Sequence, residues 1–328
     1  MSTPSGGGMA RRLASALSQA RGIATPALLI VSYHRVLSVP DPLLPGEPDV
    51  QQFCRQLDWL QGCFHILTVK EAVRRRRTGA LSPRSLCITF DDGYANNAEI
   101  AVPELARRGI AATFFVASGY TRGLNMWNDQ VIEAVRRAPD GFDLAELGLR
   151  ACVLGDDQSR IVAIGLLLAA FKYRPPAERA RCVARLCEAT QMSAPGPLMM
   201  NESQVRAVAD AGMEVGAHTV SHPILTSLPE DEARREIVHG KGQLEDMIGR
   251  PVVSFAYPNG RPKTDYRRTH VDMVRAAGYE SAVSTAWGSV RADSDVLQLP
   301  RVVPWDRTRA RYLMRLMRCY LQSPAATA

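Results

Sequence analysis

The chain has 328 residues, of which 46% are hydrophobic and 22% are charged, and its formal net charge is +7. These values are typical of a globular protein and exclude a disordered or fibrous chain. The seven cysteines are irregularly spaced and form no C-x-x-C pair, so we expect neither a disulfide framework nor a cysteine zinc site. No apolar run reaches the roughly 18 residues of a membrane span, so we expect no integral membrane segment.

The N-terminal residues 1–24 are expected to form a flexible tail and a short basic helix that begins near Met9. The apolar run that follows is too short for the core of a signal peptide. We therefore expect a cytoplasmic location.

Apolar segments that resemble buried strands alternate with helical patterns in two parts of the chain. In the first part we expect strands at 27–33, 85–90 and 112–116, with helices near 53–60 and 98–108. In the second part we expect strands at 213–217 and 252–256, with helices over 201–211 and 229–247. Alternation of this kind predicts an α/β protein with a parallel sheet, either open or closed as a barrel.

A run of four arginines, residues 74–77, could attract nucleic acid or an acidic polymer. It ends a segment that begins with the capping-box pattern TVKE at residues 68–71. We therefore expect the arginines in the last turn of a helix, where the dipole favours cations. No recognition motif accompanies them, and we expect no nucleic-acid partner.

The strand pattern is absent from about residue 124 to residue 199, where 161–170 and 178–189 read as amphipathic helices. We expect a helical insertion here, which could cover a substrate groove. The predicted organisation is one α/β unit of residues 25–123 and 200–306, the insertion 124–199, and a C-terminal helix and tail over 307–328.

Two adjacent carboxylates, Asp91 and Asp92, follow the expected strand at 85–90, and Gly93 then turns the chain. Active sites of α/β proteins are assembled at the carboxyl ends of strands. A surface Asp-Asp-Gly turn is the alternative, but the apolar strand directly before it favours a functional site.

Two histidines, His218 and His222, follow another expected strand at a spacing that lets both imidazoles converge on one metal ion. Histidines completed by one carboxylate are typical of a catalytic divalent metal with open positions, and we expect Zn²⁺. Such a metal makes bound water acidic and polarises a carbonyl, while a second aspartate can accept the proton. The pattern therefore favours amide or ester hydrolysis.

The motifs TFDDG at residues 89–93 and HTVSH at residues 218–222 resemble those of the polysaccharide deacetylases with the NodB-homology fold, a distorted (β/α) barrel. The resemblance covers about residues 27–304, apart from the helical insertion. It implies that Asp91 is the general base and that Asp92, His218 and His222 hold the metal.

The third motif of this family normally reads R-x-P-Y or R-x-P-W, whereas residues 255–260 read FAYPNG. The resemblance implies that the backbone N–H of Tyr257 helps to stabilise the oxyanion. The arginine that orients the base is missing from the motif. Arg301, after a later strand, is the predicted replacement, within about 4 Å of Asp91. A surface position for Arg301 is the alternative.

The C-terminal Leu-x-His motif of the family is also missing, since no histidine follows His270. Residues 32–36, SYHRV, resemble the N-terminal Tyr-His motif of the exopolysaccharide-modifying branch. This resemblance implies that His34 is the general acid that protonates the leaving amine. A purely structural histidine is the alternative.

We therefore expect a metal-dependent hydrolase that removes N-acetyl groups from a hexosamine-containing polysaccharide, or from an oligosaccharide or lipid-linked precursor of one. An O-acetyl esterase or a small-amide hydrolase could use the same residues. The missing motif arginine leaves a third possibility, a catalytically weak carbohydrate-binding protein.

Overall fold

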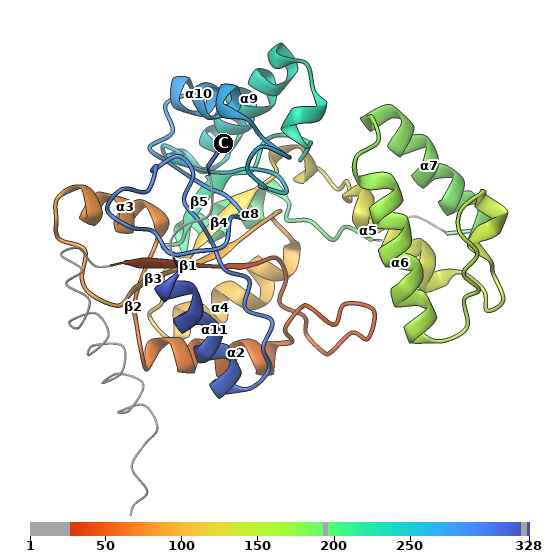
Figure 1. Cartoon of the computed structure of the whole chain (residues 1–328), viewed down its shortest axis with the longest axis horizontal. Coiled ribbons are helices and arrows are strands. Elements are labelled where there is room, and N and C mark those ends of the chain that lie inside the picture. Colours follow the sequence, from red (N-terminus) through yellow and green to blue (C-terminus); the bar gives the residue numbers. More distant parts are fainter. Residues whose placement is uncertain (1–26, 193–195, 323–326) are drawn as a thin grey trace, which may run out of the picture.

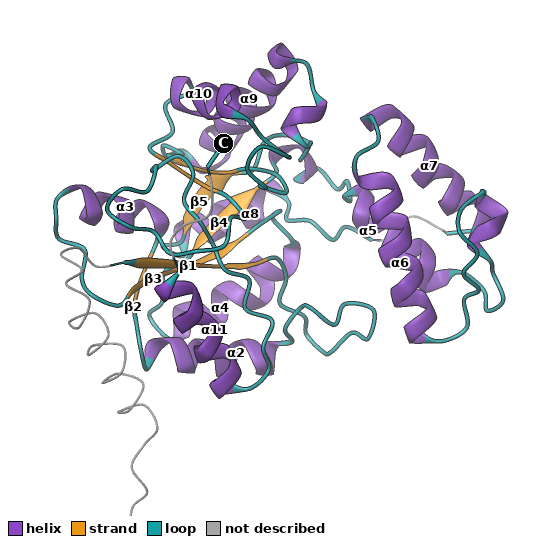
Figure 2. Ribbon diagram, viewed as in Figure 1, coloured by secondary structure: helices purple, strands orange, loops and turns teal. Residues whose placement is uncertain are grey.

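Parallel strands form one curled sheet at the centre of the molecule, with helices outside it (Figures 1 and 2). The computed structural model describes residues 27–192, 196–322 and 327–328, so the tail and helix predicted for residues 1–24 lie outside the described part. The strands are β1 (Leu28–Tyr33), β2 (His65–Leu67), β3 (Ser85–Phe90), β4 (Thr113–Val116), β5 (Glu214–Ala217), β6 (Ser254–Ala256) and β7 (Ser281–Val283). Their order is β1-β3-β4-β5-β6-β7, and β2 pairs with the first half of β3.

A short segment, residues 299–302, joins the two ends of this sheet. Leu299 bridges Val283 of β7, and Val302 bridges Val31 of β1, both in the parallel sense. The N–H of Val302 also donates to the carbonyl of Ile30 at 2.9 Å. The sheet therefore closes on itself as a distorted barrel, which confirms the predicted fold class.

The sequence explains why β1 and β3 are buried. Their sequences, LLIVSY and SLCITF, are nearly continuous apolar runs, and every residue of both strands is buried. Parallel strands covered on both faces have this composition. The helices of the barrel are α2 (Val50–Gln61), α3 (Val69–Arg77), α4 (Val102–Arg107), α8 (Glu202–Asp210), α9 (Glu230–Ile248), α10 (Arg268–Ala276) and α11 (Arg309–Leu321). A π-helical turn, Asn97–Ala101, precedes α4.

One half of the predicted capping box of the arginine-rich helix is present, the N-cap Thr68, while the Glu71 carboxylate accepts from Arg74 and Arg75 instead. The hydroxyl of Thr68 accepts a hydrogen bond from the N–H of Glu71 at 3.2 Å, and the four arginines occupy the last turn of α3. Arg76 donates to three carbonyls of residues 291–294. This arginine therefore packs against the protein itself.

Three further helices lie beside the barrel: α5 (Trp127–Arg137), α6 (Asp157–Lys172) and α7 (Pro176–Ala189) (Figure 1). They surround an apolar cluster of their own that includes Val131, Leu167 and Leu186. The chain leaves the barrel after β4 to form them and returns before α8. Within the described residues, no helix has the length and hydropathy of a transmembrane span.

Polar contacts connect these helices to the barrel. Arg136 of α5 pairs with Asp41 at 2.6 Å, on the loop between β1 and α2. The hydroxyl of Tyr173, just after α6, donates to the buried Asp265 at 3.3 Å. The inserted helices are therefore attached to loops that follow β1 and β6.

Candidate active site

The residues predicted from the sequence come together at one rim of the barrel, because each follows the carboxyl end of a strand or of the closing segment. Asp91 and Asp92 follow β3, His218 follows β5, and His34 follows β1. Arg301 lies on the closing segment between its bridges to β7 and β1.

Arg301 forms a bidentate ion pair with Asp91. Nη1 donates to Oδ1 and Nη2 donates to Oδ2, each at 2.7 Å, and the two side chains are 1% and 5% exposed. The third guanidinium nitrogen, Nε, donates to the carbonyl of Ser284 at 3.0 Å. Burial alone would raise the pKa of Asp91, but the adjacent guanidinium outweighs it and holds the pKa below its ordinary value. The structure thus keeps Asp91 ionised and fixes its orientation.

Asp92, His218 and His222 form a compact group of potential metal ligands whose ligand atoms all lie within 4.8 Å of one another. The Nε2 atoms of both histidines lie 3.4 Å from Oδ1 of Asp92. Nδ1 of His218 must carry a hydrogen, because it donates to the carbonyl of Ala256 at 2.8 Å. Its Nε2 is then left with a lone pair toward the carboxylate when the ring is neutral.

This arrangement fits a divalent cation. Burial lowers the pKa of His222 to about 4, so its imidazole is neutral at pH 7 and is also available as a ligand. The lone pair on Nε2 of His218 repels the Asp92 carboxylate unless a cation lies between them. Tetrahedral ligands about 2.1 Å from a zinc ion lie about 3.4 Å apart, as the two imidazoles do from Asp92. The donor set of two nitrogens and one oxygen leaves room for further ligands.

The backbone around these ligands is strained. Asp92, Thr219 and His222 have φ values of 76°, 65° and 55°, in the left-handed region that residues other than glycine seldom adopt. Such conformations persist where surrounding contacts hold them, and they are frequent at functional sites. The hydroxyl of Thr219 supplies one such contact by accepting from the N–H of His222 at 3.0 Å.

Helix α9 supplies further contacts to the histidine loop, through Glu236. The N–H groups of Val220 and Ser221 donate to its Oε2 at 2.8 Å each, and the hydroxyl of Ser221 donates to Oε1 at 2.7 Å. Gly240, one turn later, packs so closely that a Cβ there would meet the Thr219 carbonyl carbon at 2.9 Å. No sequence pattern distinguishes Glu236 from other residues, because acidic residues are common on an exposed helix.

His34 is half-buried at the same rim. Burial alone would lower the pKa of its imidazole, but the carboxylates of Asp92, Glu47 and Asp91 outweigh burial and raise the pKa above its ordinary value. Glu47 lies on the loop after β1 and accepts a hydrogen bond from the N–H of Arg35 at 3.1 Å. The environment therefore favours a protonated imidazole.

Tyr257 is placed differently from the expectation. Its N–H donates to the carbonyl of Val283 at 3.2 Å, because the ladder between β6 and β7 continues through this residue. Its side chain is buried, and the hydroxyl donates to the carbonyl of Leu297 at 3.0 Å. The Tyr257 N–H is therefore already used by the sheet. In the same turn, Asn259 has a φ of 59°, and its N–H meets no acceptor among the described residues.

A curled parallel sheet with paired carboxylates and imidazoles at its carboxyl rim defines an α/β-barrel hydrolase. Two solved structures share the fold. A Streptococcus pyogenes deacetylase, PplD, in complex with acetate is 19% identical with a TM-score of 0.58, and the match covers 90% of this chain and 99% of that one. IcaB from Ammonifex degensii is 20% identical with a TM-score of 0.55, over 89% of this chain and 99% of that one.

The family model for polysaccharide deacetylases matches residues 78–143 and 185–282, which make up half of the sequence. The chain therefore belongs to the polysaccharide deacetylase family. YxkH of Bacillus subtilis (strain 168), assigned by its name to the polysaccharide deacetylases, is 22% identical over 280 residues, 84% of this chain and 71% of that protein. A poly-β-1,6-N-acetyl-D-glucosamine N-deacetylase of Staphylococcus epidermidis is 31% identical over 114 residues, 30% of this chain and 39% of that protein.

Proposed function

We propose that this protein is a metal-dependent hydrolase that removes N-acetyl groups from a hexosamine-containing polysaccharide or from its precursor. The observation that carries the proposal is the pairing of two features at one rim. One is the group of Asp92, His218 and His222, whose potential ligand atoms all lie within 4.8 Å of one another. The other is the buried Asp91, held ionised beside them by Arg301.

A divalent cation held by Asp92, His218 and His222, for which we propose Zn²⁺, would polarise the acetyl carbonyl and lower the pKa of water. Asp91 accepts the proton of the attacking water. Arg301 keeps the Asp91 carboxylate unprotonated and in one orientation, as the family arginine missing from residues 255–260 would. His34 then donates a proton to the departing amine.

The oxyanion donor is reassigned in this proposal. The amide of Tyr257 is engaged with Val283, while the amide of Asn259 in the same turn is free among the described residues. We propose the Asn259 N–H as the donor to the oxyanion, because a preorganised backbone amide costs no reorganisation during reaction.

The substrate is proposed from the relatives. One of them is named for N-deacetylation of poly-β-1,6-N-acetyl-D-glucosamine, so a β-1,6-linked N-acetylglucosamine oligomer is the first substrate to test. The catalytically weak binding protein was suggested by the missing motif arginine. The contact of Arg301 with Asp91 removes that reason to prefer it.

The test is acetate release by metal-analysed protein from a β-1,6-linked N-acetylglucosamine tetramer and from a chromogenic acetyl ester. We expect release from the tetramer, its loss on chelation, and its return on adding Zn²⁺. Release from the ester alone would identify an O-acetyl esterase. Absence of release from either, by protein loaded with metal, would reject the hydrolase.

A further inference from the structure

Arg35 holds an unused set of hydrogen-bond donors beside the candidate site. It directly follows His34, and its side chain is only 16% exposed. Its Nε is buried and has no acceptor within the described residues, and its recorded hydrogen bond is made by the backbone N–H, to Glu47. The Nε–H is thus removed from water without an acceptor from the described protein.

The position of this guanidinium is nevertheless well defined. Its central carbon lies 4.8 Å from the centre of the Tyr94 ring, a cation–π contact, and Nη1 lies 4.0 Å from Oδ1 of Asp129. A separation of 4.0 Å is too long for a hydrogen bond. In turn, the hydroxyl of Tyr94 donates to the buried Asp129 carboxylate at 3.1 Å. These contacts orient Arg35 and leave its donors free.

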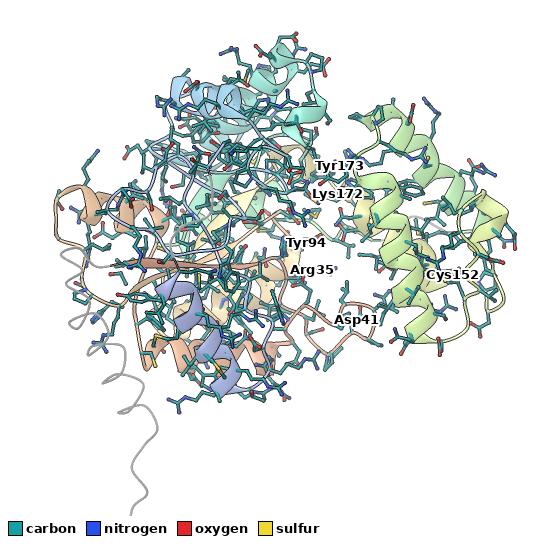
Figure 3. All side chains as sticks on the ribbon, in the orientation of Figure 1. Arg35, Asp41, Tyr94, Cys152, Lys172 and Tyr173 are labelled. Carbon is teal, nitrogen blue, oxygen red and sulfur yellow. The ribbon has the colours of Figure 1, made fainter. Side chains whose placement is uncertain are left out.

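The cluster adjoins the proposed centre on two sides. Arg35 follows the proposed acid His34, and Tyr94 comes two residues after the proposed ligand Asp92. Figure 3 shows Arg35 and Tyr94 on the side of the barrel that faces α5, α6 and α7. Asp129 belongs to α5, so the helical insertion contributes one member of the cluster.

We propose that Arg35 is a substrate-binding residue that donates hydrogen bonds to oxygens of the sugar next to the one that is deacetylated. This inference rests on the proposed function. A buried donor without an acceptor, such as the Arg35 Nε–H, is unfavourable, and a ligand that supplies an oxygen atom removes the cost. A planar guanidinium can donate two parallel hydrogen bonds to neighbouring oxygen atoms.

The charges around Arg35 favour a neutral sugar over an anionic group. Asp129 lies directly beside the guanidinium, and the carboxylate of Asp92 is close enough to raise the pKa of Asp129. An ionised Asp129 would repel a carboxylate or phosphate on the substrate. Hydroxyl and acetamido oxygens accept hydrogen bonds from Arg35 without this repulsion.

The test compares a substrate that has neighbouring sugars with one that has none. For Arg35→Met we expect kcat/KM on the β-1,6-linked N-acetylglucosamine tetramer to fall about 10- to 100-fold, and the loss on the chromogenic acetyl ester to be at least about tenfold smaller. Arg35→Lys, which keeps the positive charge and removes the planar guanidinium, should give an intermediate loss of kcat/KM on the tetramer. It also keeps the test valid if Arg35→Met folds poorly.

The matched control is Arg136→Met, which removes another arginine between the insertion and the barrel, the partner of Asp41. It should change activity on the two substrates by the same factor. If Arg136→Met reproduces the tetramer-specific loss, Arg35 acts by attaching the insertion and the proposal is wrong. Equal losses on ester and tetramer for Arg35→Met would also overturn it.

Calorimetric titration with the tetramer separates this proposal from the proposed function. In protein carrying Asp91→Asn, adding Arg35→Met should weaken tetramer binding about tenfold or more. Unchanged binding, or no binding by either protein, rejects the role of Arg35 whatever the turnover assays show. Tighter binding of an acidic uronate tetramer than of the neutral one would reject the neutral ligand.

Discussion

Arg301 and Asp91 are 210 positions apart in the chain and are joined by two hydrogen bonds of 2.7 Å. A buried carboxylate that loses its partner becomes an uncompensated charge, and breaking such a pair costs about 3–5 kcal/mol. We therefore expect Arg301→Met to lower the free energy of unfolding by about this amount and to reduce kcat/KM. Urea denaturation and acetate release measure the two effects. Arg275→Met, at an exposed ion pair, should change stability by less than about 1 kcal/mol. An Arg301→Met protein as stable as this control would show that the pair is unimportant.

The proposed roles of Asp91 and His222 predict different losses. Asp91→Asn should keep the metal and lose activity by about 100- to 10,000-fold, the usual contribution of a general base. His222→Ala removes one of three ligands and should lose both metal and activity. Metal content by mass spectrometry, with acetate release on the same samples, tests both. A His222→Ala protein that retains its full metal content would contradict the ligand assignment.

Glu236 should control metal affinity without touching the metal. Its carboxylate accepts three hydrogen bonds from the loop between His218 and His222. Partners that orient ligands typically contribute about 10- to 100-fold in metal affinity, and we expect Glu236→Gln to weaken Zn²⁺ binding by such a factor. Competition with a chelating dye measures this. Glu232→Gln, an exposed change one turn earlier on α9, is the control and should have no effect. Equal affinities for the two variants would remove Glu236 from this role.

The raised pKa of His34 predicts the pH dependence of turnover. A general acid works in its protonated form, and a raised pKa keeps His34 protonated to higher pH than an ordinary imidazole. Glu47 is one of the carboxylates responsible, so Glu47→Gln should move the alkaline limb of the kcat profile to lower pH. Asp41→Asn, on the same loop, should leave the limb in place. An alkaline limb that also stays in place for Glu47→Gln would remove this carboxylate from the mechanism.

Asp129 predicts a pH dependence of stability. Burial, reinforced by Asp92, raises its pKa to about 7, against about 3.9 in an unfolded chain. Between these values the folded state binds more protons than the unfolded state. The raised pKa of Asp129 therefore contributes fully to the free energy of unfolding below pH 4, and this contribution is lost as the pH rises to about 7. In urea denaturation, Asp129→Asn should remove this part of the decline. A wild-type and a variant curve with the same slope would mean that Asp129 is ionised throughout.

Much of the fold could be predicted because a buried parallel strand leaves an apolar run in the sequence. The strands β1 and β3 each left such a run. The residues directly after these runs could therefore be identified as candidates for the site, namely His34, Asp91 and Asp92. β2 and β7 have three residues each, as β6 has, but only β6 ends a longer apolar run, residues 252–256, that predicted it. Helix α5 was not predicted separately within the insertion, although its apolar residues Trp127, Val131 and Val135 recur at helical spacing.

The site was less predictable where it depends on backbone hydrogen bonding or on partners distant in sequence. The motif around Tyr257 did not reveal that the ladder from β6 continues through that residue and occupies its N–H. Glu236 acts through a loop 15 residues before it, and no spacing rule links the two. Arg301 could be proposed because residues 255–260 lack the arginine of the family motif. Its ion pair with Asp91, however, forms only when the segment that carries Arg301 closes the barrel.

The segment that closes the barrel is also the last part of the sheet to be made. During synthesis, β1 and β3 leave the ribosome about 270 and about 210 residues before the segment that bridges β7 to β1 and carries Arg301. Until that segment docks, Asp91 lacks its guanidinium and the sheet has two open edges. Completion of the fold and readiness of the proposed base are thus one event, and a chain cut short before Arg301 would lose both together.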